Sequence, residues 1–367
     1  MFRRGAAAGA LCTFNTAAVL LLAGTVRAQS RVVELNEAGW KALRAGYGDR
    51  AASLFAEALK MRPDDPVLLL GSGAAANAQG RQKEAIAQLQ RALELNPRLT
   101  PASRLLGQIA YAEGDVDLAL RTYENALKYA PGDPGLSRGL DEWRRETDVH
   151  RSFDERRYDQ FRVLFEGREE KQLARQATEI FRLAFRRICT RLGEFPTATI
   201  VAVLYTEQQF RDITRAPEWS SGQYDGRIRV PVAGAEQHPE LFERVLTHEL
   251  THAILADIAP RGIPVWLNEG LAQYFEGASP DAARKRMKAL GSSIPLKNLE
   301  GSFARLGSRV AVQAAYDESL LAVSVIVDKP GFIWIRLLHE LEESRSAEAT
   351  ITSFGWSYAD LEAPFAR

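Results

Sequence analysis

The sequence GAAANAQGRQKEAIAQLQRALELNP, residues 73–97, is the middle copy of a pattern that decides the first part of the fold. Its proline recurs at a constant interval of 34 residues, as Pro63, Pro97 and Pro131. A period of this length is typical of helix–turn–helix repeats. The pattern therefore predicts a helical solenoid whose copies stack on one another.

Other positions keep the same register. Small residues recur where paired helices must approach closely, and larger apolar residues recur in the seam between them. These sets are Gly39, Gly73 and Gly107; Ala51, Ala85 and Ala119; Phe55, Leu89 and Tyr123; and Ala58, Ala92 and Ala126. Each repeat proline should end a second helix, because proline cannot continue the hydrogen-bond ladder. We expect the turns inside the repeats at Gly48, Gly80 and Gly114.

Residues 32–136 resemble three tetratricopeptide repeats. The resemblance implies an all-α solenoid whose concave surface binds a peptide or a protein partner. A spacer role stays open, because the repeated residues are all explained by packing and three repeats are close to the minimum for stability.

Length and composition limit the remaining possibilities. A chain of 367 residues is long enough for two domains. Its 46% apolar and 26% charged residues are ordinary for globular protein. Lys plus Arg equals Asp plus Glu at 47 each, so no long-range field would attract nucleic acid, and we expect no nucleic-acid partner.

The amino-terminal residues predict an export signal. A basic start that ends at Arg4 precedes the apolar residues 19–23 and small residues around Ala28. We expect a signal peptide over residues 1–28, cleaved after Ala28. The alternative is an uncleaved membrane anchor, because no charge interrupts the chain between Arg4 and Arg27. Either outcome places the rest of the chain outside the cytoplasm, in the periplasm or secreted.

The sequence changes character after the repeats. Residues 137–158 are charge-rich without a clear period, and we interpret them as a capping helix or a linker. Short apolar runs at 161–165 and 198–205 predict strands. Residues 169–191 between them have helical spacing and predict a helix that connects the two strands.

Residues 227–232 predict a third strand. Its apolar residues alternate with Arg227 and Arg229, which is typical of an edge strand with one polar face. Pro231 near its end is tolerated at an edge and awkward in a sheet centre.

The stretch His248-Glu249-Leu250-Thr251-His252 carries the chemistry. Residues four apart share one face of a helix, so both imidazoles can reach one ion while Glu249 projects beside it toward a bound water. Imidazole suits zinc, and a catalytic zinc site takes three protein ligands and keeps its fourth position open. The spacing therefore predicts one zinc ion per chain, with a further ligand from downstream.

Glu269 is our choice for that ligand. It lies in Trp266-Leu267-Asn268-Glu269-Gly270, on a second helix after a loop with Pro260, Gly262 and Pro264 that turns the chain back. Two other carboxylates compete. Asp257 is close to His252 in sequence, and Glu276 lies about two turns further along the second helix.

Residues 160–365 resemble the gluzincin-like, MA-like metallopeptidase domains of bacteria, which are often attached to tetratricopeptide repeats. The resemblance spans residues 161–167, 217–232, the histidine pair and residues 264–277, and it continues in residues 315–319 and 354–357. Together with the repeats, it implies an α+β fold with a small mixed sheet, a metal-binding helix and a helical carboxy-terminal lobe over residues 159–367.

The resemblance also implies roles for individual residues. His248, His252 and Glu269 would be the zinc ligands, and Glu249 the general base in peptide hydrolysis. It places Tyr316 nearest to the oxyanion, although an aromatic residue on an apolar helix is usually core. One residue departs from the family: where relatives often have an acidic residue that orients a histidine, this chain has Gln273.

The predicted function is an exported zinc metallopeptidase that acts on a peptide or protein substrate, with repeats that bind a partner. Two other interpretations stay open. The chain could be a partner-binding repeat protein with a degenerate zinc domain, or a zinc-independent scaffold of the cell envelope. The intact Glu249 argues against the degenerate domain, because a structural zinc site has no use for an unligated base.

Overall fold

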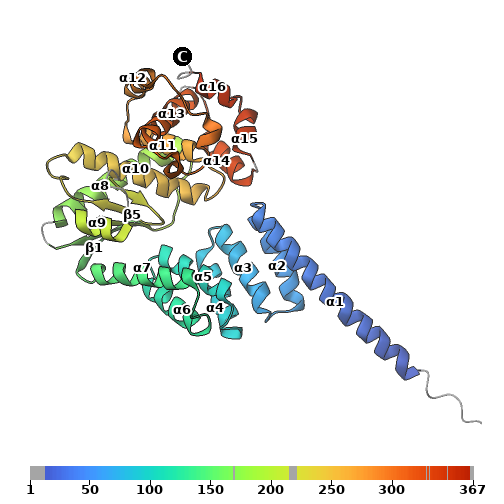
Figure 1. The fold of residues 1–367 in the computed structure, drawn as a ribbon. Coiled ribbons are helices and arrows are strands. Elements are labelled where there is room, and N and C mark those ends of the chain that lie inside the picture. Colours follow the sequence, from blue (N-terminus) through green and yellow to red (C-terminus); the bar gives the residue numbers. More distant parts are fainter. Residues whose placement is uncertain are drawn as a thin grey trace, which may run out of the picture. The chain divides into compact units, whose positions relative to one another are not determined.

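The computed structural model describes residues 13–167, 170–214, 221–327, 329, 331–344 and 346–363, with the backbone alone for residues 13–28. The described chain is mostly helical with one small mixed sheet, which confirms the α+β class. It divides into two compact units, Met1–Ile109 with Arg121–Leu136, and Ala110–Leu120 with Ser137–Arg367 (Figure 1). Residues 1–12 of the predicted signal peptide lie outside the described part.

Paired helices build the repeats. They are α1 (Thr13–Arg44), α2 (Gly48–Met61), α3 (Pro66–Ala78), α4 (Gln82–Leu95), α5 (Thr100–Ala112), α6 (Val116–Tyr129) and α7 (Pro134–His150). Helices α2, α4 and α6 each end two residues before a repeat proline, as the loss of a backbone donor requires. The predicted cleavage position after Ala28 falls inside α1.

The seam between the repeat helices follows the sequence pattern. The repeated alanines and large apolar residues of α2, α4 and α6 are all buried. A Cβ atom at Gly39 would stand 2.7 Å from the ring of Phe55, and one at Gly73 would stand 2.8 Å from Cγ of Leu89. The glycines are therefore required by the close approach of neighbouring helices.

The turns inside the repeats correct one expectation. A left-handed backbone conformation is needed at Gly46, Gly80 and Gly114, whose φ angles are 86°, 68° and 84°. Gly48, which we expected in the first turn, is instead the first residue of α2. The left-handed glycines thus keep the same 34-residue interval as the prolines.

Within the described residues, the second unit contains one sheet of five strands in the order β1-β2-β3-β5-β4. The strands are β1 (Phe153–Tyr158), β2 (Phe161–Glu166), β3 (Ile200–Tyr205), β4 (Gln223–Tyr224) and β5 (Ile228–Pro231). Strands β2, β3 and β5 are parallel, and β1 and β4 pair antiparallel at the two ends. Helix α8 (Glu170–Leu192) connects β2 to β3, as the sequence predicted.

One face of the sheet forms the main core. Side chains such as Phe161, Ala202 and Ile228 point toward α8 and toward α10 (Pro239–Ile258). The alternate residues Val201, Val203 and Tyr205 face the other way and form a second cluster with Phe210. Phe210 lies on the short helix α9 (Glu207–Thr214).

Two expectations about the sheet were wrong. Residues 153–158, assigned to a capping helix or linker, form strand β1, which pairs along its whole length with β2. Strand β5 is not the edge, because the two residues of β4 pair with it on the outer side. Arg227 and Arg229 are also buried, with 3% and 2% of their surface exposed, so the polar face of this strand is covered.

Helices also form the carboxy-terminal lobe. They are α11 (Val265–Glu276), α12 (Pro280–Leu290), η1 (Leu296–Leu299), η2 (Phe303–Leu306), α13 (Arg309–Val327), α14 (Trp334–Glu343), α15 (Ala347–Ser353) and α16 (Tyr358–Glu362). Of the helices searched in the described residues, α13 alone is long and apolar enough to cross a membrane. It packs against α11 and α12, and 56% of its most apolar stretch is buried in the protein.

Candidate metal centre

Helices α10 and α11 carry the predicted ligands. Pro239 occupies the first turn of α10, where its missing N–H costs nothing, and apolar residues bury most of the helix. The chain then turns back at Gly262, and α11 begins at Val265 and ends at the left-handed Gly277. The two helices pack against each other, so their facing side chains meet.

The structure brings His248, His252 and Glu269 together. Oε2 of Glu269 lies 3.4 Å from Nε2 of His248 and 3.6 Å from Nε2 of His252. All three donor atoms lie within 4.8 Å of one another. Asp257, one competing carboxylate, lies exposed near the end of α10 and is not part of the group.

The donor atoms fit a zinc ion. Ligand atoms at zinc distances in a tetrahedral site are separated by about 3.3 Å, close to the spacing of Oε2 from the two imidazoles. Oε2 of Glu269 is also buried without a hydrogen-bond partner among the described residues. A buried carboxylate oxygen without a partner is costly unless it coordinates a metal.

The opposite nitrogen of each imidazole is held by an acceptor. Nδ1 of His248 lies 2.9 Å from Oε2 of Glu276, and Nδ1 of His252 lies 2.9 Å from Oδ1 of Asn268. A carboxylate and an amide oxygen only accept, so each Nδ1 donates and each Nε2 is left facing Glu269. Such partners fix the ring orientation of metal-binding histidines.

Glu276 therefore orients the ring of His248. It lies seven residues after Glu269, two turns along the same face of α11. Arg244 donates to its other oxygen at 2.8 Å. Gln273 instead donates to the backbone carbonyl of Tyr316 at 2.7 Å and so ties α11 to α13.

Charge is balanced within the ligand set. Burial lowers the pKa of both histidines, but the carboxylate of Glu269 outweighs burial and raises the pKa, with help from Glu276 at His248. Burial would raise the pKa of Glu269, yet His252 and His248 hold it well below its usual range. Protons therefore occupy the imidazoles when no cation does, and a metal ion would displace them.

Glu249 lies beside the ligands in a cavity of about 550 Å³ that His248 and Tyr316 also line. Only 6% of its surface is exposed. Burial raises the pKa of its carboxyl above the usual value, against the neighbouring histidines, which lower it. A Cβ atom at Gly222 would stand 2.6 Å from Oε1 of Glu249, so the backbone at this glycine lies directly against the carboxylate.

Tyr316 lies on α13, and its side chain lines the same cavity as Glu249. Its ring packs edge-on against Phe303, with 5.4 Å between centroids. Burial raises the pKa of its hydroxyl, and the nearby carboxylates of Glu269 and Glu249 raise it further. The hydroxyl thus stays protonated and can donate a hydrogen bond.

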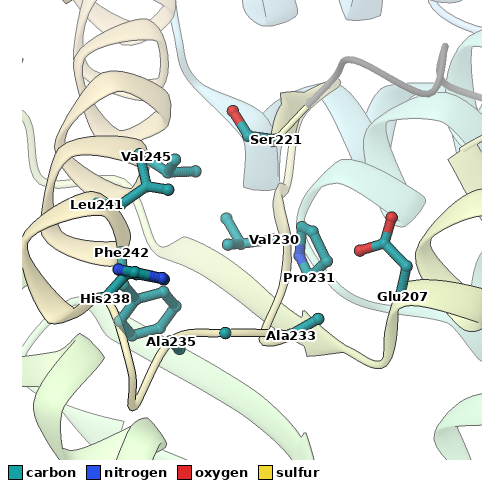
Figure 2. Close-up of a pocket in the computed structure, with 11 residues that line it drawn as sticks. Glu207, Ser221, Val230, Pro231, Ala233, Ala235, His238, Leu241, Phe242 and Val245 are labelled. Atoms are coloured by element: carbon teal, nitrogen blue, oxygen red, sulfur yellow. The ribbon is translucent and has the colours of Figure 1, made fainter.

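A second cavity of about 250 Å³ adjoins the first and shares Ser221 and Val245 with it (Figure 2). Side chains of α10, among them Leu241 and Val245, face Val230 and Pro231 of β5 across it. Its lining is largely apolar.

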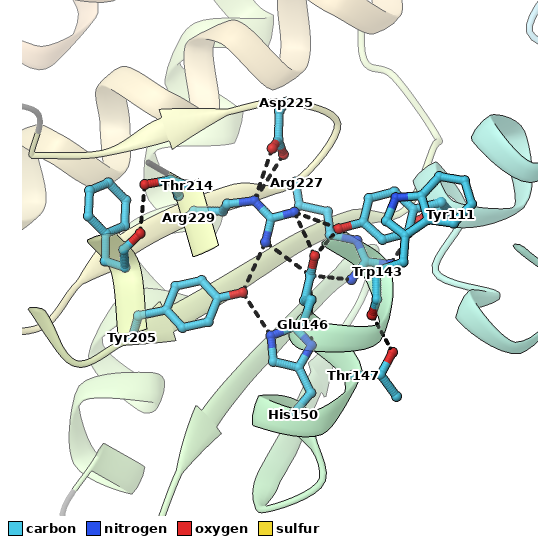
Figure 3. Close-up of polar contacts among 11 residues, drawn as sticks. Tyr111, Trp143, Glu146, Thr147, His150, Tyr205, Thr214, Asp225, Arg227 and Arg229 are labelled. Atoms are coloured by element: carbon cyan, nitrogen blue, oxygen red, sulfur yellow. Dashed lines mark hydrogen bonds and ion pairs between the residues drawn. The ribbon is translucent and has the colours of Figure 1, made fainter. Parts of the chain in front are cut away.

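On the sheet face opposite to α8 and α10, Glu146 of α7 binds the two buried arginines of this region, Arg227 and Arg229 (Figure 3). Its Oε1 accepts from Nη1 of Arg227 and from Nη1 of Arg229, each at 3.0 Å. The hydroxyl of Tyr111 also donates to Glu146, and Arg229 donates to the hydroxyl of Tyr205 at 2.9 Å. This group, Glu146, Arg227, Arg229, Tyr111 and Tyr205, is called the arginine cluster below.

Sequence reasoning missed three contributors to the candidate metal centre. Asn268 directly precedes Glu269 in the quoted motif, and Glu276 was weighed as a rival ligand. Their positions on α11 placed both near the metal centre, but which histidine each one contacts depends on tertiary packing. Nothing in the sequence around Gly222 indicates its contact with Glu249, because that contact depends on how the backbone at Gly222 packs against α10 in the folded protein.

Comparison with known proteins bears on the repeats. Residues 36–100 match the model of the tetratricopeptide repeat family. The Hsp70-Hsp90 organizing protein of Triticum aestivum is 31% identical over 107 residues, a segment that covers 29% of this chain and 18% of that relative. The matched segment is thus less than a fifth of the relative's length. The matched residues fall on the repeats, and the metal centre rests on its own residues and geometry.

Two solved structures share the repeat fold over 32% of this chain, each with a TM-score of 0.31. One is the first tetratricopeptide domain of Spaghetti (RPAP3) bound to an HSP90 peptide, 22% identical and covered over 97% of its length. The other is the Sgt2 tetratricopeptide domain from Aspergillus fumigatus, 24% identical and covered over 79%. The match to the family model, over residues 36–100, shows tetratricopeptide repeats in the amino-terminal region of this chain.

Proposed function

We propose that this protein is a zinc-dependent peptidase whose tetratricopeptide repeats bind a peptide or protein partner. One observation carries the enzymatic part of the proposal. Oε2 of Glu269 is buried without a hydrogen-bond partner among the described residues, and it faces the Nε2 atoms of two histidines at 3.4 and 3.6 Å. These residues would hold one zinc ion per chain.

Zinc, when bound by three protein ligands, polarises a carbonyl and lowers the pKa of water in its open position. Glu249 is buried in the cavity beside the ligands, and its raised pKa suits a group that takes up a proton and gives it to the leaving amine. The protonated hydroxyl of Tyr316 would donate to the oxygen on which negative charge develops.

The side chains around the centre would also select and position substrate. The adjoining cavity between α10 and β5 is largely apolar and would accept an apolar side chain. Gly222 keeps the backbone against Glu249 and so restricts the positions that its carboxylate can take.

The partner-binding part of the proposal is supported by the family of the repeats. Tetratricopeptide repeats stack into a curved solenoid, and such surfaces bind extended segments of other proteins. The chemistry proposed for the partner is therefore a peptide segment. Export through the amino-terminal residues remains a prediction.

A second candidate function is a repeat protein that binds a partner and carries a non-catalytic zinc domain. The observation that favours it is that the reported family match falls on the repeats alone. The unligated, buried Glu249 favours the peptidase, because a structural zinc site would close its fourth position.

Glu249→Gln separates the two functions. Glutamine keeps the shape of the side chain but cannot accept a proton, so the variant should keep zinc and fold while peptide hydrolysis falls by about a hundred to ten thousand-fold. Glu269→Gln should lose zinc affinity together with activity, because a neutral ligand replaces an anionic one. Digestion of an unbiased peptide library, analysed by mass spectrometry, provides the substrate.

Equal cleavage by wild type and Glu249→Gln would contradict the proposed mechanism. Cleavage by neither protein, with zinc bound to both, would favour the second candidate function, a partner-binding repeat protein with a non-catalytic zinc domain.

A further inference from the structure

The cavity at the candidate metal centre extends beyond the ligands to α12 and α13. Arg286 of α12 lines it together with Gln313 and Tyr316 of α13. The side chain of Arg286 is 51% exposed. A cationic group thus borders the same cavity as Glu249 and His248.

Arg286 is held by a buried carboxylate. Its Nε donates to Oδ2 of Asp317 at 2.8 Å, and its Nη2 donates to Oδ1 at 2.6 Å. The side chain of Asp317 is 2% exposed, and Gln313 donates to it at 3.3 Å. Two parallel hydrogen bonds fix the plane of the guanidinium group and leave Nη1 outside the pair.

Neutralising Asp317 would not by itself require an exposed arginine. Buried carboxylates need a partner, and this explains why Asp317 is paired. It does not explain why the half-exposed side chain of Arg286 also lines this cavity. Arg284 on the same helix is also half-exposed, at 50%, but it pairs with the 85% exposed Asp281 and does not line this cavity, so the position of Arg286 rather than its exposure distinguishes it.

The other arginine in the lining, Arg244, is already engaged in a contact at the metal centre. Arg244 donates to Glu276, the residue whose second oxygen holds Nδ1 of His248. Arg286 has no such link to a histidine in the contacts described above. Of the two arginines, it is the one placed to receive a ligand.

We propose that Arg286 is a specificity-determining residue that binds a carboxylate of the peptide substrate. The proposal rests on the proposed peptidase function. The substrates would be peptides with a negative charge close to the bond presented to Glu249. That carboxylate belongs either to an acidic side chain or to the carboxy terminus, and both would bind the same guanidinium group.

Binding of paired hydroxamates to the zinc-loaded full chain tests this without hydrolysis. Each pair consists of a short peptide hydroxamate with a carboxylate and its neutral amide counterpart, compared by calorimetry. Wild type should bind the carboxylate form at least about tenfold more tightly, because a hydrogen bond to a charged group is worth that much. Arg284→Gln, the matched control on the same helix, should keep this preference.

Arg286→Gln together with Asp317→Asn should abolish the preference. The double variant removes both charges at once, so no buried carboxylate is left without a partner. The affinity ratio within each pair compares two ligands on one protein, and a lower folded fraction therefore cancels. Arg286→Lys should give an intermediate preference, because lysine keeps the positive charge but lacks the planar guanidinium group that donates two parallel hydrogen bonds.

Two pairs separate the sources of the carboxylate. One pair compares glutamate with glutamine in a peptide amide, and the other compares a free carboxy terminus with its amide. Equal affinity within both pairs for wild type, or a preference that survives in the double variant, would overturn the proposal. Because hydroxamate binding needs zinc and the cavity but no hydrolysis, its result is read separately from the comparison of peptide cleavage by wild type and Glu249→Gln.

Discussion

Gly222 lies so close to the carboxylate of Glu249 that this position cannot carry a side chain without movement. A Cβ atom would stand 2.6 Å from Oε1 and 2.9 Å from Cγ of Glu249. We predict that Gly222→Ala keeps zinc and fold but lowers kcat/KM for peptide hydrolysis about tenfold to a hundredfold, because small misplacements of a catalytic group are costly. Steady-state kinetics measure kcat/KM, and the zinc content of the purified variant shows whether the metal is retained.

Gly301→Ala is the matched control. A Cβ atom at Gly301 would meet nothing within 4 Å, so this variant should hydrolyse peptides like wild type. Unchanged activity in Gly222→Ala would mean that Glu249 is free to move and that its contact with the loop has no part in positioning it.

His150 gives stability a dependence on pH. Its Nε2 lies 2.8 Å from the hydroxyl of Tyr205, and its Nδ1 lies 3.7 Å from Oε1 of Glu146, one turn earlier on the same face of α7. Burial lowers the pKa of His150 to about 4, with Glu146 opposing and Arg227 and Arg229 adding to the effect. Between the ordinary histidine pKa and 4, the unfolded chain binds a proton that the folded chain does not, so stability falls as pH falls.

We predict that the free energy of unfolding decreases by roughly 2 kcal/mol more in wild type than in His150→Phe between pH 7 and pH 5. Phenylalanine keeps an aromatic ring in the stack and removes the titration, although it gives up the hydrogen bond to Tyr205. Urea denaturation at the two pH values provides the comparison. A variant that loses as much stability as wild type would assign this acid sensitivity to other groups.

At the residue scale, the sequence could predict that the candidate ligands meet, but not which residues support them. His248, Glu249 and His252 share one helix, so local spacing determines which of them can meet. Glu269 required only a second helix packed against the first. The role of Glu276 depends on how far along α11 the ring of His248 reaches, and that distance is set by tertiary packing.

At the scale of elements, β5 shows where pattern reasoning stops. Alternation of Ile228 and Val230 with two arginines predicted two faces correctly, but it could not show what covers the polar face. In the structure α7 supplies Glu146 to that face, and the arginines are buried in pairs with it. The alternation of charged and apolar residues therefore predicted an exposed edge, whereas the structure has the buried arginine cluster at this place.

We predict that Glu146→Ala lowers the free energy of unfolding of the second unit by about 3–5 kcal/mol, because it leaves Arg227 and Arg229 buried without their carboxylate. Glu142→Ala, an exposed position on the same helix, should change it by less than about 0.5 kcal/mol. Chemical denaturation measures both. Similar losses for the two variants would mean that the arginine cluster is not a net contributor to stability.

At the scale of the whole molecule, the repeats were the most predictable part. A 34-residue period fixes helix ends, glycine turns and the buried seam together, because each copy repeats the same local contacts. The division into units was harder to predict. Residues Ala110–Leu120 belong with the second unit, where Tyr111 accepts hydrogen bonds from Arg227 and Arg229, and no periodicity reveals such contacts.

The central claim also belongs to the scale of the whole molecule: one metal ion joins α10 to α11. The measurement that tests it most directly is the zinc content of the full chain, purified without added metal and determined by atomic spectroscopy. We predict one zinc ion per chain in wild type and none in the His248→Ala, His252→Ala double variant, since one carboxylate alone is an inadequate site. Stoichiometric zinc in the double variant, or a wild-type protein that binds no zinc even when it is supplied, would contradict the account.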